Sequence, residues 1–74
     1  MTAKEMFEKL DMEQGKAENY IEYHYKNDMD YPYGYYAYIL FDLKNKSWRS
    51  NLVGTTTEQE HAIFKQTEEL GWNK

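Results

Sequence analysis

Two pairs of side chains in this 74-residue chain have the spacing of metal ligands. Glu58 and His61 form a Glu-x-x-His motif, which di-iron sites in helix bundles use twice, but the motif occurs once here. Asp28 and Asp30 have the spacing that opens a calcium-binding loop, but Pro32 takes the third ligand position, and the required glycine and distal glutamate are missing. Two histidines without any cysteine cannot complete a structural zinc site. We therefore expect no metal and no cofactor.

His24, which lies between Tyr23 and Tyr25, is the candidate for a general base. A histidine flanked by aromatic residues on a strand is more often packed or solvated than catalytic. The four glycines are scattered singly, so the chain has no glycine-rich phosphate loop. A domain of this length also has little room for a substrate pocket of ~300 Å³. We expect a protein that is not an enzyme.

The residues best suited to binding are tyrosines, five of which fall within residues 31–38. Tyrosine offers a large amphipathic contact at low entropy cost. Alternate side chains of a strand point to opposite faces of a sheet, and one layer of helices covers a single face, so some of these rings should be exposed. The expected contact residues are Tyr20, Asp28, Asp30, Tyr31, Tyr33, Tyr35, Tyr36 and Tyr38. The alternative is that these tyrosines form the core, with their hydroxyl groups at its edge.

Charge limits the class of partner. Nine Lys and Arg against thirteen Asp and Glu give a net charge of −4, which opposes binding to a phosphate backbone. We expect a protein partner, and the acidic charge favours one with a basic surface, because complementary charge speeds association. A weak single-strand binder is a further alternative, with tyrosines stacking on bases at ~1–3 kcal/mol each. The cations for it would be Lys26, Lys44, Lys46 and Arg49.

Size and composition bear on domain count, oligomeric state and location. A chain this short buries only about 60% of its unfolded surface and forms one domain with one core. Because no disulfide or metal can reinforce it, a structural homodimer, paired through sheet faces or edges, is a second hypothesis beside a monomer. The first residues lack an apolar signal segment, and no apolar run approaches the ~20 residues of a membrane span. We expect a cytoplasmic protein.

The first half of the chain predicts one helix and one strand. Thr2 and Glu5 have the spacing of a capping box, which predicts a short helix ending near Asp11. Residues 12–19 are polar and contain Gly15 as a breaker, so they are expected to be a connection. Residues 20–26 alternate in the strand period, with Ile21, Tyr23 and Tyr25 on one side.

The second half predicts two more strands and a long helix. Residues 35–43 and 47–53 alternate in the strand period and are separated by a polar turn. Residues 55–57 are threonines that offer three overlapping capping boxes with residues 58–60, and Gly71 stands where a left-handed cap belongs, with Trp72 placed to fold back. The prediction is an α+β domain in which two helices cover one face of a three-stranded antiparallel meander.

Three segments resemble small hypothetical proteins of Gram-positive bacteria and their phages. They are Thr-Ala-Lys-Glu-Met-Phe-Glu-Lys-Leu at residues 2–10, Ile-Leu-Phe-Asp-Leu-Lys at 39–44 and Lys-Gln-Thr-Glu-Glu-Leu-Gly-Trp at 65–72. The tyrosine-rich middle departs from the pattern, and no functional residue can be carried over. The resemblance implies an origin in a phage, a prophage or its host. It favours an accessory role, plausibly inhibition of a host nucleic-acid-handling or defence enzyme in the manner of anti-CRISPR or anti-restriction proteins.

Overall fold

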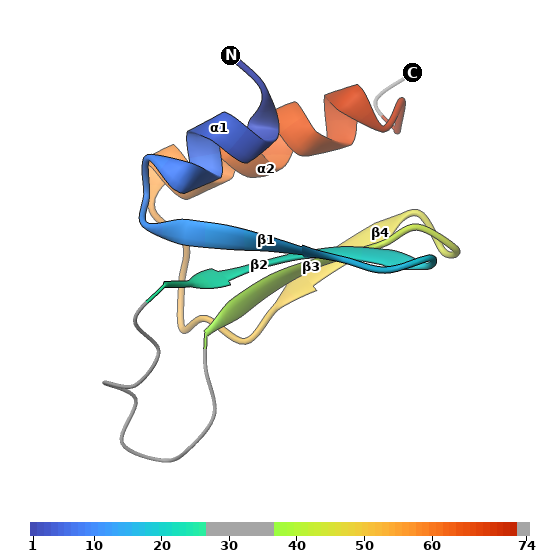
Figure 1. Ribbon diagram of the computed structural model, residues 1–74, viewed down its shortest axis with the longest axis horizontal. Helices are drawn as coiled ribbons and strands as arrows, with labels where there is room; N and C mark the ends of the chain where they lie inside the picture. Colours follow the sequence, from blue (N-terminus) through green and yellow to red (C-terminus); the bar gives the residue numbers. More distant parts are fainter. Residues whose placement is uncertain (27–36, 73–74) are drawn as a thin grey trace.

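The computed structural model describes residues 1–26 and 37–72, which form an α+β domain of four strands and two helices (Figure 1). The elements in chain order are α1 (Ala3–Glu8), β1 (Met12–Lys16), β2 (Tyr20–Tyr25), β3 (Tyr38–Asp42), β4 (Ser47–Ser50) and α2 (Thr57–Glu69). The strands pair antiparallel in the order β1-β2-β3-β4, so each strand lies beside its neighbour in sequence. Both helices lie on the same face of the sheet (Figure 1).

The fourth strand corrects the predicted three-stranded meander. Residues 12–16 were expected to belong to a polar connection, but they form β1, which pairs with β2 from Met12↔Tyr25 to Lys16↔Ile21. Asp11, at φ 62°, turns the chain sharply from α1 into this strand, and its carbonyl accepts a hydrogen bond from the Lys26 N–H at 2.9 Å. Met12 then packs in the core with none of its surface exposed.

The helix starts follow the predicted capping boxes. The Thr2 hydroxyl accepts from the Glu5 N–H at 3.1 Å, and the Glu5 carboxylate accepts from the Thr2 N–H at 2.8 Å. This helix stops at Glu8, before the predicted end near Asp11. Of the three boxes available at α2, the chain uses the one between Thr56 and Gln59, in which both reciprocal bonds form. Each box satisfies two of the backbone donors that a helix start leaves open.

The end of α2 is the predicted left-handed cap. Gly71 has φ 77° and donates its N–H to the Glu68 carbonyl at 3.0 Å, while the Trp72 N–H reaches the Thr67 carbonyl at 2.9 Å. This pair of bonds is the Schellman arrangement, which needs a residue that tolerates positive φ. The Trp72 ring folds back onto Phe41, with ring centroids 6.3 Å apart.

Aromatic rings build the centre of the core between the helices and the sheet. Phe7 of α1 stacks on Tyr23 of β2 with centroids 3.8 Å apart and planes 18° apart. Phe41 of β3 meets both rings edge-on, at 6.4 and 6.1 Å. Met12, Ile21, Ile39, Ala62 and Ile63 complete the buried cluster. The predicted alternation in residues 20–26 and 35–43 is confirmed at each of these described positions.

Two strands are described over fewer residues than the sequence predicts. Strand β4 ends at Ser50, short of the predicted residue 53, and Val53 is fully exposed. Beyond Ser50 the ladder is closed by Asn51, whose side-chain carbonyl accepts the Tyr38 N–H at 2.7 Å. Residues 35 and 36 of the predicted central strand lie outside the described residues, and β3 is described from Tyr38.

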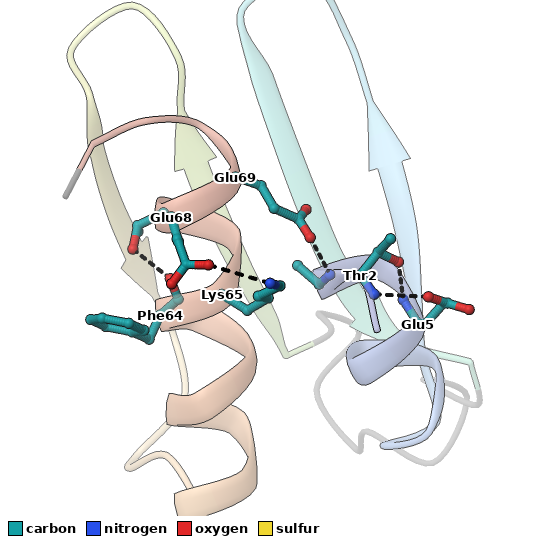
Figure 2. A network of polar contacts seen from close by, with 8 residues as sticks. Thr2, Glu5, Phe64, Lys65, Glu68 and Glu69 are labelled. Atoms are coloured by element: carbon teal, nitrogen blue, oxygen red, sulfur yellow. Dashed lines mark hydrogen bonds and ion pairs between the residues drawn. The ribbon is translucent and has the colours of Figure 1, made fainter. Parts of the chain in front are cut away.

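One hydrogen bond joins the first turn of α1 to the last turn of α2. The Glu69 carboxylate accepts a hydrogen bond from the Ala3 N–H at 2.9 Å, beside the capping box of α1 (Figure 2). Lys65 and Glu68 form an ion pair at 3.3 Å on the exposed side of α2. The Ala3 bond fixes the first turn of α1 against the last turn of α2, although a helix this short is marginal alone.

Candidate functional site

The structure describes two of the predicted contact residues. Tyr20 begins β2 and Tyr38 begins β3. The remaining predicted contacts, which lie outside the described residues, are Asp28, Asp30, Tyr31, Tyr33, Tyr35 and Tyr36. They belong to the stretch of sequence that joins β2 to β3, the two central strands of the sheet.

Tyr20 and Tyr38 lie on the sheet face opposite the helices, which we call the open face (Figure 1). The register places eight side chains with marked chemistry on it: Glu13, Tyr20, Glu22, His24, Tyr38, Leu40, Asp42 and Arg49. Tyr20 pairs with Asp42 at one end of the face, and Tyr38 pairs with His24 at the other. The two tyrosines are therefore separated by the Glu22↔Leu40 pair and do not form one cluster.

A histidine and two carboxylates form a polar cluster on the open face. His24 Nδ1 lies 2.8 Å from Glu22 Oε1, and His24 Nε2 lies 3.7 Å from Glu13 Oε2. Gly15, opposite Glu22 in the register, leaves room for this carboxylate, because a Cβ at residue 15 would lie 3.2 Å from Glu22 Oε1. The acids orient the imidazole, but within the described ranges no group of three or more potential ligands could hold a metal.

Two other tyrosines have structural roles on the face that the helices cover. The Tyr23 hydroxyl donates to Gln66 Oε1 and accepts from Gln14 Nε2 at 3.0 Å, and burial raises the pKa of this phenol above its ordinary 10.0. The Tyr25 hydroxyl accepts from Gln59 Nε2 at 2.7 Å. These bonds satisfy polar groups that would otherwise be costly to bury. Tyr23 and Tyr25, which are not among the predicted contact residues, thus serve the core with hydrogen-bonded hydroxyls.

Two carboxylates, half-buried Asp42 and exposed Glu5, bind backbone N–H groups at a turn and at a helix start. Asp42 accepts hydrogen bonds from the N–H groups of Lys44 and Asn45 at 3.0 and 3.1 Å, and from the Asn45 amide at 2.8 Å. The bonds from Asn45, followed by the Lys44 N–H and the charge of Arg49, lower the pKa of Asp42. The bonds from the Thr2 N–H and hydroxyl similarly lower the pKa of Glu5. Asp42 thereby fixes the turn that leads into β4.

Sequence reasoning missed a groove between β4 and α2, which we call the β4–α2 groove. It has a volume of ≈ 420 Å³ and lies beside Trp48 on the strand and Ile63 and Phe64 on the helix. Lys46, Glu60 and Trp72 complete its main lining. A sequence signal for it is the pair of large apolar residues Trp48 and Phe64, but their meeting depends on how α2 crosses the sheet.

Comparisons with protein-family models, with curated proteins and with solved structures found no match. Across the part of the chain that the structure describes, none of the helices has the length and apolar character needed to span a membrane.

Proposed function

We propose that this chain is a non-enzymatic binding protein that contacts a protein partner through the open face and the adjoining tyrosine-rich segment 31–36. The observation that carries the proposal is that, among the described residues, no helix covers this face of the sheet, which presents aromatic and apolar side chains (Figure 1). Tyr20 is 41% exposed, and Tyr38 and Leu40 are half-buried on the same face. An uncovered surface of this kind normally marks a contact site.

The distribution of polar groups supports contact with a protein. Leu40 stands at the middle of the open face, with Glu22 opposite it on β2 and Arg49 opposite it on β4. An apolar centre with a charged surround is the usual anatomy of a protein interface. In the sequence, the tyrosine-rich segment lies between the two strands that carry Tyr20 and Tyr38.

The proposed partner is a host or phage protein with a basic surface. The chain has a net charge of −4, and the open face carries the acids Glu13, Glu22 and Asp42 against the single arginine Arg49. Nucleic-acid-handling enzymes have basic surfaces of the sign that this charge would attract. Together with the resemblance to phage-associated proteins, this favours inhibition of such an enzyme, plausibly one with a role in defence.

The test is capture from a Gram-positive lysate with matched surface variants. We expect the unaltered chain to recover one stoichiometric protein, and Leu40→Glu to lose it, because the new carboxylate lies at the centre of the open face. Val53→Ser, a fully exposed apolar position away from that face, is the control and should retain the partner. Equal recovery by all three proteins would show that the open face is not the contact surface.

Two further measurements separate this proposal from its alternatives. A gel shift with single-stranded DNA or RNA that persists at ~150 mM salt, where the screening length is about 8 Å, would assign direct nucleic-acid binding instead. Sedimentation of the chain alone should show a monomer at micromolar concentration. A dimer that Leu40→Glu dissociates would assign the open face to self-association.

A further inference from the structure

The outer edge of β4 has main-chain groups directed away from the sheet. The Asn51 N–H donates to the Tyr38 carbonyl at 3.3 Å, so this pair is hydrogen-bonded. Hydrogen-bonded and non-hydrogen-bonded pairs alternate along an antiparallel ladder, so Leu40↔Arg49 is bonded and Phe41↔Trp48 and Ile39↔Ser50 are not. The N–H and C=O groups of Trp48 and Ser50 therefore point outward. Among the strands of the described chain, none pairs with this edge.

The same edge borders the apolar wall of the β4–α2 groove. Trp48 is 44% exposed and Phe64 is 61% exposed, although both are large and apolar. The Phe64 side chain projects from α2 on the side away from α1 (Figure 2). Ile63 lies beside it in the groove. An extended chain along β4 would thus find main-chain partners on the strand and apolar contacts on the helix.

We propose that β4 and the β4–α2 groove bind an extended peptide segment of a partner protein, which adds to the sheet as a fifth strand. Strand addition gives affinity through main-chain hydrogen bonds and specificity through alternate side chains. Arg49 is shared with the open face, but the main-chain edge and the groove lie outside that face, so occupancy of this site does not depend on the function proposed there.

The register specifies the chemistry of the segment. Trp48 shares the helix-covered face with Phe41, whereas Arg49 shares the open face with Leu40. In an added strand, the side chains turned toward α2 meet Trp48 and Phe64 and should be apolar. The side chain opposite Arg49 should be acidic, since opposite charges across a strand pair attract. Lys46 and Glu60 carry opposite charges in the groove lining, so that side keeps its apolar preference. The segment is therefore one of alternating apolar and acidic residues.

The charge of this edge favours such a partner over a second copy of β4. The turn and strand carry Lys44, Lys46 and Arg49, three of the nine cations in an acidic chain. An antiparallel two-fold pairing of β4 with β4 centred on Arg49 would oppose two like charges, which is destabilising across a strand pair. A foreign acidic strand instead neutralises them.

The binding experiment uses the isotope-labelled full chain and a capped nine-residue peptide of alternating glutamate and valine with phenylalanine at its centre. We expect amide exchange at Trp48 and Ser50 to slow on addition of peptide, because their N–H groups become hydrogen bond donors to it. A peptide with lysine in place of glutamate should bind at least about tenfold more weakly. No added protection at about 1 mM peptide, or equal binding of the lysine peptide, would overturn the proposal.

Two variants locate the site. Ser50→Pro removes an outward N–H without removing a ladder bond, so the sheet should persist while peptide binding is lost. Phe64→Ser removes the exposed wall of the groove and should weaken binding at least about tenfold. Val53→Ser is the matched control and should bind normally. Normal binding by Phe64→Ser, or by folded Ser50→Pro, would place the peptide elsewhere. A concentration-dependent dimer that protects Trp48 without peptide would assign the edge to a second copy and overturn the proposal.

Discussion

The two outer strands of the sheet are covered to very different extents. On β1, Met12 has no exposed surface and packs against the core cluster that includes Phe7 of α1. On β4, Trp48 is 44% exposed and borders the β4–α2 groove. In the sheet, β1 and β4 occupy equivalent outermost positions. The difference arises because α1 follows directly into β1 and packs on it, whereas α2 leaves a groove along β4.

An uncovered edge strand is a hazard, because its unpaired main-chain groups accept other chains. The protein limits this hazard at β4 by shortness and by charge: the strand has four residues, and Arg49 lies within it. At β1 the first residue, Met12, is buried under α1, whereas Glu13 and Lys16 are exposed and charged. The start of β1 can be altered only at the expense of the core, while the charged edge of β4 can select a complementary segment. Binding capacity is therefore expected at β4 and not at β1.

Removing the Phe7 ring, which packs on the β1 side of the sheet, should cause the largest loss in the free energy of unfolding. Phe7→Ala deletes the ring stacked 3.8 Å from Tyr23 and leaves a cavity in a fully buried site. We expect a loss of ~3–5 kcal/mol in the free energy of unfolding. That is comparable to the whole stability of a small domain, about 5 kcal/mol at the low end. Urea denaturation followed by circular dichroism measures it. A loss below about 1 kcal/mol would mean that α1 does not close this side of the core.

Tyr23→Phe tests the polar bonds that link β1 to α2. It leaves Gln66 Oε1 and Gln14 Nε2 without their hydroxyl partner, at an expected cost of ~1–3 kcal/mol. Alkaline pH should act at the same point. Because burial raises the pKa of Tyr23, its contribution to stability is complete below the ordinary value of 10.0 and is lost as pH rises through the folded value. Unfolding curves from pH 8 upward should show a decline in the unaltered chain that is smaller in Tyr23→Phe.

Acid should loosen the β4 hairpin locally. The hydrogen bonds in the turn lower the pKa of Asp42. Its contribution to the free energy of unfolding is therefore present above its ordinary pKa of 3.8 and is lost as pH falls through the pKa of the folded state. Asp42→Ala removes these bonds at neutral pH. We expect faster amide exchange at Lys44 and Asn45 and unchanged exchange in β1. The loss in the free energy of unfolding should be smaller than that caused by Tyr23→Phe. Equal loosening of β1 would show that the two edges are coupled. Glu5→Ala is the matched change at α1.

The smallest effect is expected on the groove side. Phe64→Ser removes a ring that is 61% exposed, and serine and phenylalanine have similar helix propensities. The free energy of unfolding should change by no more than about 0.5 kcal/mol. Thermal unfolding beside Phe7→Ala makes the contrast direct. A loss as large as that of Phe7→Ala would show that Phe64 belongs to the core and that the groove is not a free surface.

The sequence predicted the elements whose signals are local. The capping residues Thr2 and Thr56 and the left-handed Gly71 act on their immediate neighbours, so their roles could be recognised without knowing the fold. The alternation around Tyr23 and Phe41 likewise identified the helix-covered face. In contrast, β1 reads Met-Glu-Gln-Gly-Lys and has neither β-branched nor aromatic residues. It is a strand because β2 offers a partner edge and Met12 fills the core, and both conditions arise from tertiary contacts.

The candidate sites were less predictable than the fold. The presence of Tyr20 and Tyr38 on the side away from the helices follows from strand alternation. Their separation to opposite ends of that side depends on the register of β2 and β3, which the sequence pattern did not specify. The β4–α2 groove needs still more information, because its two walls come from elements whose crossing is determined by the packing of α2 against the rest of the core.

The bond from Ala3 to Glu69 has a consequence for the order of events during synthesis. Helix α1 emerges from the ribosome first, yet it has only six residues, and a helix of that length is marginal in water. Its partner α2 follows all four strands in the chain. At a translation rate of ~5–20 residues per second, α1 waits several seconds for this hydrogen bond. The bond that joins the helices is therefore a late contact, and before it forms α1 depends on its packing against the sheet, as in the Phe7–Tyr23 stack.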